Sequence, residues 1–156
     1  MFLIPRNFWE IRNTNKKGRG VFANKPIKAK TIIGEYTGQK IKIEEYELEK
    51  DKDGLYLMFL NDKYAIYPDL EKDDVHLINH SCNPNCWIFN NKKHIYFFTL
   101  RDIKVGEELT ISYLLPPIGN CNPCTHQCYC GSKNCTGTMH QTEKQYEKWQ
   151  EFSVYL

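Results

Sequence analysis

The feature that most restricts how this chain can fold is a group of cysteines near its C-terminus. Five of the seven cysteines fall in the segment CNPCTHQCYCGSKNC, which runs from Cys121 to Cys135. The last three have the spacing Cys128-x-Cys130-x4-Cys135, and a glycine after the second permits a tight turn. An odd total argues against a disulfide scaffold, and thiolates so spaced are typical zinc ligands. We therefore expect a zinc site; the alternative is a set of buried free thiols.

Three thiolates leave one position of a tetrahedral zinc site to be filled. Local spacing favours Cys124 or Cys121, which would make a self-contained zinc knuckle. Cys82, distant in the sequence, would instead fasten the tail to the main body. The candidates for this position are Cys82, Cys86, Cys121, Cys124 and His126.

Length and composition describe an ordinary globular protein. The 156 residues suffice for one domain with a small appendage, and 41% hydrophobic with 26% charged residues is typical of a folded chain. No apolar run approaches the roughly 20 residues that cross a bilayer, and the start MFLIPRNFWE lacks the features of a secretory signal. We expect folding in a reducing cytosol. A net charge of +2 is only a weak argument for nucleic-acid binding.

Short strands separated by Gly and Pro turns are predicted for most of the chain. Residues 1–40 alternate apolar runs with turns such as NTNKKGRG. Tyr56–Tyr67 is expected to form two strands around Asn61-Asp62, and CWIFNNKKHIYFFTL two more around Asn90-Asn91. These patterns indicate a β-rich body.

One further strand and two helices complete the prediction. The strand is Glu108–Leu114, after a turn at Val105-Gly106. Ile41–Asp53 is rich in helix formers and is followed by Gly54, which predicts an internal, mostly exposed helix. The segment TEKQYEKWQEFSVYL predicts an amphipathic C-terminal helix, because three aromatic residues are spaced three apart: Tyr146, Trp149 and Phe152.

The segment LINHSCNPN, Leu77–Asn85, carries more chemistry than a turn needs. His80 and Cys82 could be a base and a thiol nucleophile, but the sequence places no group to orient the histidine. The Gly-x-Gly of KKGRGVFA permits a ligand to approach the backbone, yet alone it is a common turn between strands. Tyr113, taken alone, is a strand aromatic in the core.

Together, these segments resemble the SET-domain family of protein lysine methyltransferases, including its post-SET zinc tail. The motifs are KGRGVFA, GEYTGQKI, YLMFL, INHSCNPNC, HIYFFTLRDIKVGEELTISY and CYCGSKNC, and they cover roughly residues 10–138. The resemblance implies a mainly β (α+β) fold: small curved sheets around a pseudoknot, with a zinc-bound post-SET tail and a C-terminal helix. It implies a SET domain over residues 1–117, a post-SET zinc-binding segment over 118–139 and the helix over 140–156.

The resemblance also gives roles to single residues. It implies that the methyl donor S-adenosylmethionine lies against the backbone of Gly18, Arg19 and Gly20, and that Asn79 and His80 hold its amino and adenine ends. It makes Cys82 the fourth zinc ligand, with Cys128, Cys130 and Cys135. Cys121, Cys124 and His126 are left without a family role.

Tyr113 matches the family's catalytic tyrosine, whose hydroxyl orients the lysine amine and supports the transferring methyl group beside the cofactor. Tyr36 and Tyr56 fall where the family has aromatic residues lining the lysine channel, and such a wall suits a methylated ammonium group. Ile111 occupies the position that tunes the number of methyl groups, where the family usually has Phe or Tyr. Since Ile111 has no hydroxyl to hold a water, we expect di- or trimethylation.

Three further positions depart from the family pattern. Ser112 replaces a common Asp and His76 stands where Arg is frequent, which bears on cofactor affinity. Thr136 follows the last cysteine of the motif, where Arg is common. None of these departures removes a residue that methyl transfer needs.

The expected activity is S-adenosylmethionine-dependent protein-lysine N-methylation, on a histone-tail lysine or another basic protein with an exposed lysine. No membrane partner is expected, the small positive charge gives only weak support for nucleic-acid binding, and the sequence predicts no oligomeric state. The expected location is cytoplasmic or nuclear, or a host cell if the source is bacterial or viral. The alternatives are a non-catalytic SET-like module that binds a peptide or nucleic acid, and a thiol enzyme using Cys121-x-x-Cys124.

Overall fold

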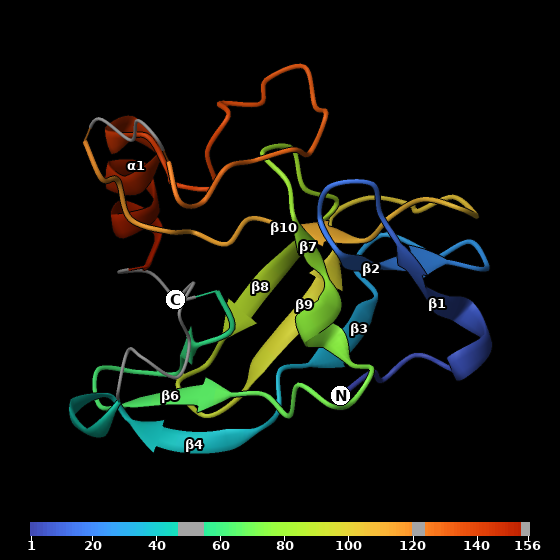
Figure 1. The fold of residues 1–156 in the computed structure, drawn as a ribbon. Coiled ribbons are helices and arrows are strands. Elements are labelled where there is room, and N and C mark those ends of the chain that lie inside the picture. The colour runs from blue at the N-terminus through green and yellow to red at the C-terminus, as the bar shows by residue number, and fades with distance from the viewer. Residues whose placement is uncertain (47–54, 120–123, 154–156) are drawn as a thin grey trace.

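Small β-sheets are the main regular structure of the described residues, and the α-helix α1 follows them near the C-terminus (Figure 1). The computed structural model describes residues 1–46, 55–119 and 124–153. Within these residues, ten strands form two two-stranded and two three-stranded sheets. The mainly β architecture expected from the sequence is therefore confirmed. The described residues include no helix that is both long and apolar enough to cross a membrane.

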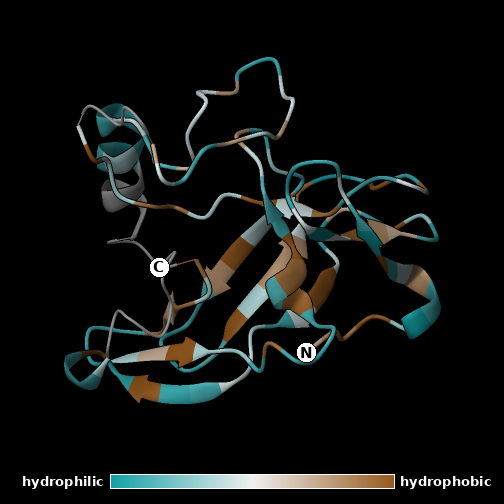
Figure 2. Cartoon of the chain, viewed as in Figure 1, coloured by the Kyte–Doolittle hydropathy of each residue, from teal (hydrophilic) through white to brown (hydrophobic). Residues whose placement is uncertain are grey.

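The central sheet has the order β3-β9-β8, with neighbouring strands antiparallel. Its strands are β3 (Ile32–Glu35), β8 (Cys86–Asn90) and β9 (Ile95–Thr99). Alternate residues of β9 are buried, the pattern of a strand with one face on the core, and Phe97 is fully buried. Hydrophobic residues concentrate on these central strands in Figure 2.

The N-terminal hairpin pairs β1 (Trp9–Asn13) with β2 (Arg19–Ala23), after a short 3₁₀ helix η1 (Arg6–Phe8). In the turn of this hairpin, the backbone N–H of Thr14 donates to the carbonyl of Gly18 at 2.7 Å. Gly18 has φ +69°, a conformation that residues with a Cβ rarely adopt. The predicted turn is thus present, and it holds the Gly-x-Gly segment at the start of β2.

The third sheet, of order β4-β6-β5, corrects one prediction. Its strands are β4 (Gln39–Lys42), β5 (Met58–Phe59) and β6 (Tyr64–Tyr67). The helix expected from Ile41 is wrong at its start, because Ile41 pairs with Ala65 in the β4–β6 ladder. A 3₁₀ helix, η2 (Ile43–Glu45), follows, and the remainder of the expected helix lies largely outside the described residues. Here strand pairing outweighs local helix propensity.

The fourth sheet joins β7 (Asn79–His80) and β10 (Thr110–Ile111) in parallel. Before β7, the 3₁₀ helix η4 (Val75–Leu77) starts at Asp74, whose carboxylate accepts the backbone N–H of Val75 at 2.7 Å. The last strand is shorter than expected, since it spans only Thr110–Ile111, and Leu114, with φ +54°, is no longer extended. The pair places INHSCNPNC directly beside GEELTISY, as the expected pseudoknot requires.

The C-terminal helix α1 (Glu143–Ser153) confirms the prediction of a helix in this segment. Thr142 and Gln145 form a capping box: the Thr142 hydroxyl accepts the Gln145 N–H, and the Gln145 side chain accepts the Thr142 N–H at 2.9 Å. Of the three aromatic residues predicted to share one face, Tyr146 is half-buried, and the side chains of the other two lie outside the described part. Figure 1 shows α1 and the β1–β2 hairpin at opposite sides of the molecule.

Candidate active site

A cavity of about 250 Å³ lies where the hairpin turn, β7, the end of β10 and the cysteine-rich tail meet. Of the residues predicted to bind the cofactor, all but Gly20 line it. Tyr56 from the predicted channel also lines it. A larger hollow of about 600 Å³ along β4 and β6 shares no residue with this cavity. The lining is Lys16, Lys17, Gly18, Arg19, Leu55, Tyr56, His76, Leu77, Asn79, His80, Tyr113, Gln127, Cys128, Tyr129 and Met139.

Asn79 is held by its amide nitrogen. Nδ2 donates to the backbone carbonyl of Arg19 at 3.0 Å and to Oε1 of Glu108 at 2.9 Å. Both amide hydrogens are therefore used within the protein, so the group that Asn79 can offer a ligand is the acceptor Oδ1. An acceptor at this place suits an ammonium group.

Glu108 is a site residue that the sequence analysis missed. Its carboxylate forms an ion pair with the Lys17 ammonium group, and both side chains are largely buried, 18% and 14% exposed. The pair links the hairpin turn to the segment just before β10, and Glu108 also accepts from the amide of Asn79. GEELTISY was singled out as a motif, but nothing in it told Glu108 apart from its neighbour Glu107.

Gly20 packs beneath this network and does not line the cavity. A Cβ built on Gly20 would stand 2.7 Å from Glu108 Oε1 and 2.8 Å from Asn79 Nδ2. Both distances are shorter than a carbon atom allows, so any side chain here would displace the Asn79 amide. The second glycine of the motif is therefore required by packing around Asn79.

His80 is buried, and both its ring nitrogens face protein atoms. Nδ1 accepts the backbone N–H of Tyr113 at 3.2 Å, and Nε2 lies 3.6 Å from Sγ of Cys82. Burial, with a contribution from the Lys17 charge, lowers the pKa of His80 to about 4. The imidazole is therefore neutral at physiological pH.

Tyr113 stands at the end of β10 with its ring edge toward His80, at 5.4 Å between ring centroids. Its hydroxyl donates to the backbone carbonyl of Ile78 at 3.3 Å. Burial raises the pKa of Tyr113 well above its usual range, and Tyr56 adds to this shift. The phenol keeps its proton at neutral pH, so it can orient a ligand by hydrogen bonding but cannot act as a strong base.

The other residues predicted for the channel lie at different depths. Tyr56 lines the cavity, and its ring makes an edge contact with His76 at 6.1 Å between ring centroids. Tyr36 is buried in the core, and its hydroxyl donates to the backbone carbonyl of Tyr56 at 2.5 Å. Ile111 is also buried in the core cluster, and neither Tyr36 nor Ile111 lines the described cavity. The structure thus brings Tyr56 to the cavity and puts Tyr36 behind it.

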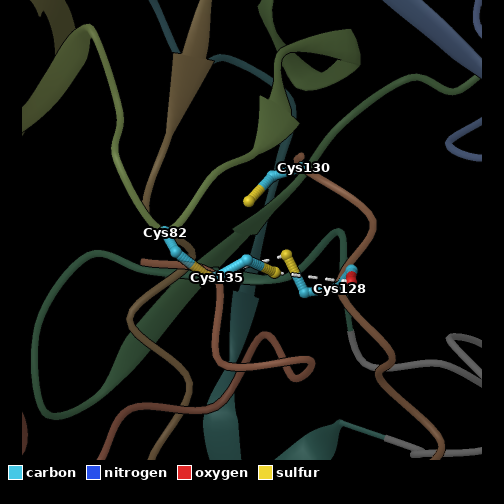
Figure 3. A group of neighbouring side chains, drawn as sticks. All are labelled: Cys82, Cys128, Cys130 and Cys135. Carbon is cyan, nitrogen blue, oxygen red and sulfur yellow. Dashed lines mark hydrogen bonds between the residues drawn. The ribbon is translucent and has the colours of Figure 1, made fainter. Parts of the chain in front are cut away.

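The four cysteines predicted as metal ligands converge, although one comes from the main body and three from the tail (Figure 3). Their sulfur atoms all lie within 4.8 Å of one another. The Cys82 and Cys128 sulfur atoms are 3.7 Å apart. Sulfur atoms bound tetrahedrally to zinc at about 2.3 Å would be about 3.8 Å apart, so the donor set fits zinc. The cluster consists of Cys82, Cys128, Cys130 and Cys135.

The other candidates for the fourth ligand position lie elsewhere or outside the described residues. Cys86 is fully buried, and burial raises the pKa of its thiol to about 12. Cys124 is disulfide-bonded, a difference from the thiols expected in a reducing environment. His126 lies 2.8 Å from His140, measured from Nδ1 to Nε2. Cys121 falls outside the described residues.

Comparison with known proteins finds similar chains among histone-lysine N-methyltransferases. The histone-lysine N-methyltransferase, H3 lysine-36 specific, of Cryptococcus neoformans var. neoformans serotype D (strain JEC21 / ATCC MYA-565) is 33% identical over 138 residues, covering 81% of this chain and 16% of the relative. Histone-lysine N-methyltransferase NSD3 of Mus musculus is 32% identical over 140 residues, covering 83% and 10%. The H3 lysine-36 specific enzyme of Homo sapiens is 33% identical over 140 residues, covering 83% and 5%.

The chain thus spans 16% or less of the length of these relatives. The family described as SET domain matches residues 18–114, more than half of the chain. This range includes Gly18, Arg19, the strand β7 and Tyr113, all of which line the cavity. The chain that brings these segments together belongs to the SET-domain family.

Proposed function

We propose that this chain is an S-adenosylmethionine-dependent protein-lysine N-methyltransferase that acts on histone H3. The observation that carries the proposal is the cavity in which Asn79, His80, Tyr113 and the Gly18 turn meet. The relatives support the choice of substrate, since they are named histone-lysine N-methyltransferases and several are named H3 lysine-36 specific. Lysine 36 of H3 is therefore the first residue to test, and a nuclear location follows from such a substrate.

The residues of the cavity fit the methyl donor. Oδ1 of Asn79 is an acceptor suited to the donor's ammonium group, and the turn at Gly18-Arg19 exposes backbone to the cavity. When bound, the donor supplies an electrophilic methyl group on a sulfonium. The chain contributes an orienting hydroxyl at Tyr113, and Tyr56 as an aromatic wall.

The lining also indicates how the substrate amine loses its proton. No carboxylate side chain is among the described residues that line the cavity, whereas Lys16, Lys17 and Arg19 are. Lys17 is paired with Glu108 and Arg19 with Asp73, so the positive charge acting on an incoming lysine would come from Lys16 and the sulfonium of the donor. This charge and poor solvation of the site would both lower the pKa of that lysine. The amine can therefore arrive neutral, with its lone pair free to attack, and needs no strong general base in the site.

The tail is proposed to act as a wall held by zinc. Gln127, Cys128, Tyr129 and Met139 line the cavity, and Cys128 is also a member of the cysteine cluster. Zinc held by the cluster would fix this wall against Cys82 in the main body. We propose residues 1–117 as the SET domain, 118–139 as the zinc-binding segment and 140–156 as a helical extension.

The number of methyl groups is proposed from Ile111. Ile111 lies in the core cluster and does not line the cavity, and an isoleucine there offers no hydroxyl to hold a water, so we propose di- or trimethylation. Mass spectrometry of the modified lysine tests this, and a purely monomethylated product would contradict it.

The test of the function is transfer of labelled methyl groups to recombinant nucleosomes. We expect label on histone H3, its loss when H3 lysine 36 is replaced by Arg, and its loss in Tyr113→Phe. Tyr96→Phe is the matched control, because Tyr96 lies on β9 and is not part of the cavity lining. Label that survives the lysine replacement would overturn the choice of lysine. No label on any histone, from folded and zinc-loaded protein, would favour the non-catalytic binding module.

A further inference from the structure

The imidazole of His80 stands between the cysteine cluster and the backbone of Tyr113. A backbone N–H can only donate, so the 3.2 Å contact with Tyr113 makes Nδ1 of His80 the acceptor. In a neutral ring the proton is then on Nε2. Nε2 lies 3.6 Å from Sγ of Cys82, within the range of an N–H···S hydrogen bond. One tautomer of His80 therefore satisfies both contacts.

The contact with Tyr113 falls at a strained point of the chain. Leu114 follows directly with φ +54°, in the left-handed region that a leucine disfavours. The hydrogen bond from the Tyr113 backbone N–H to His80 fixes the backbone just before Leu114. Because the same residue carries the hydroxyl that reaches Ile78, the position of the phenol depends on the same turn.

His80 lines the cavity, but hydrogen bonding to a cofactor does not explain these contacts. Both ring nitrogens are directed to Cys82 and Tyr113, so the ring offers the cavity its carbon edge and face. The ring is also packed against Tyr113 at 5.4 Å. What the ring nitrogens do is connect two parts of the protein.

We propose that His80 is a positioning residue that couples the metal cluster to Tyr113. The inference rests on the proposed function, in that it takes Cys82 as a zinc ligand and Tyr113 as the residue at the reacting methyl group. A zinc-bound thiolate is a stronger acceptor than a thiol, so it holds the proton on Nε2. Nδ1 is then kept as an acceptor for Tyr113, and metal binding at Cys82 orders the backbone that carries the phenol.

The first test is the tautomer of His80 in the zinc-loaded wild type, read from the ring nitrogen shifts by ¹⁵N NMR. We expect the proton on Nε2 and a Tyr113 amide proton shifted by its hydrogen bond. A proton on Nδ1 would overturn the proposal whatever the variants show. This measurement uses the wild-type protein, so it tests the role of His80 even if the variants do not fold.

Two substitutions separate the two contacts. In His80→Asn, the side-chain oxygen can still accept from Tyr113, but the donor to Cys82 is lost. We expect zinc affinity to fall by about tenfold to a hundredfold, measured by competition with a chromophoric chelator.

In His80→Gln, the amide nitrogen can replace Nε2 while the acceptor for Tyr113 is lost. We expect near wild-type zinc affinity, a changed Tyr113 environment, and a kcat lower by about tenfold or more with little change in KM for the histone.

Thr136→Val is the matched control, because Oγ1 of Thr136 also lies near Cys82 Sγ, at 3.8 Å, but has no contact with Tyr113 among those described. It should leave the Tyr113 amide shift unchanged.

Wild-type zinc affinity in His80→Asn together with an unchanged Tyr113 amide shift in His80→Gln would overturn the coupling. The expected tautomer and shifts in a wild type that transfers no methyl group would reject the proposed function and leave the coupling standing. An active wild type with the wrong tautomer would reject the coupling alone.

Discussion

Lys17 and Glu108, 91 residues apart in the sequence, form an ion pair beside the cavity, and the other oxygen of Glu108 accepts from the Asn79 amide. The carboxylate thus fixes which way the Asn79 side chain faces. Without it, the amide could rotate and present its nitrogen to an ammonium group, which would repel it.

We expect Glu108→Ala to weaken binding of S-adenosylmethionine by about tenfold or more, since a hydrogen bond to a charged group contributes about 1.5–3 kcal/mol. Glu108→Gln keeps an acceptor for Asn79 and should lose less. Isothermal titration calorimetry measures both. The control is Glu107→Gln. The carboxylate of Glu107 pairs with Arg101 and accepts from Asn85, and Glu107 is not part of the cavity lining, so this variant should keep its affinity. Equal affinities in Glu108→Ala and the wild type would contradict the assigned role of Glu108.

Gly20→Ala should lower both stability and cofactor affinity. The added Cβ would stand 2.7 Å from Glu108 Oε1, so the network around Asn79 must move, at a cost of about 1–3 kcal/mol in the free energy of unfolding. Gly106→Ala is the control that introduces backbone strain without steric overlap. Gly106 has φ +81° and no atom within 4 Å of its Cβ position, so this variant should be less stable but keep its cofactor affinity. Urea denaturation and calorimetry read the two effects. The same affinity loss in both variants would contradict the steric argument.

Removing zinc should detach one wall of the cavity. We expect a metal chelator, and separately Cys82→Ser, to lower the melting temperature and abolish methyl transfer, because binding of a structural metal contributes directly to folding. Metal analysis should find about one zinc ion per wild-type chain and much less in Cys82→Ser. Cys86→Ser is the control, since Cys86 is buried outside the cluster and the new hydroxyl could bond to Asn85 Oδ1 as the thiol does at 3.4 Å. Full zinc content in Cys82→Ser would refute the ligand assignment.

His76 should make the protein less stable in mild acid. Burial lowers the pKa of His76 below its usual value of 6.5, although Asp74 opposes the shift. Above about pH 6.5 neither the folded nor the unfolded chain is protonated there, and stability is unaffected. Below it, the unfolded chain binds a proton that the folded chain resists, so the free energy of unfolding falls by up to about 1.4 kcal/mol per pH unit. Urea denaturation of His76→Gln between pH 7.5 and about 5 should show a shallower decline than the wild type; an identical decline would contradict this role.

Local sequence signals predicted the parts of the fold that local interactions determine. The β8–β9 hairpin follows from turn residues at Asn90-Asn91, and the three-residue spacing of Tyr146, Trp149 and Phe152 predicted the helix α1. Helix propensity failed from Ile41 because the partner of that strand, β6, is distant in the sequence. The parallel pair β7–β10 is equally non-local, and only the resemblance to a family indicated it.

The site was predicted unevenly for the same reason. The Cys spacing indicated a metal site, but the fourth ligand stayed open on spacing alone, since Cys82 lies 46 residues before Cys128. Lys17 and Glu108 are charged residues among many, and no spacing marks a pair so distant. For Tyr36 the sequence identified the motif but not the position of the side chain. Tyr36 is buried in the core, because of packing that a sequence pattern does not contain, and its hydroxyl donates to the backbone of Tyr56.

The tail that lines the cavity has a consequence for how the protein is made. Synthesis runs from the N-terminus, so the hairpin turn, β7 and β10 leave the ribosome before Gln127, Tyr129 and Met139 do. A nascent or prematurely terminated chain therefore lacks one side of the pocket. Under the proposed function, the site is complete only after Met139 has left the ribosome and the four cysteines of the cluster have met.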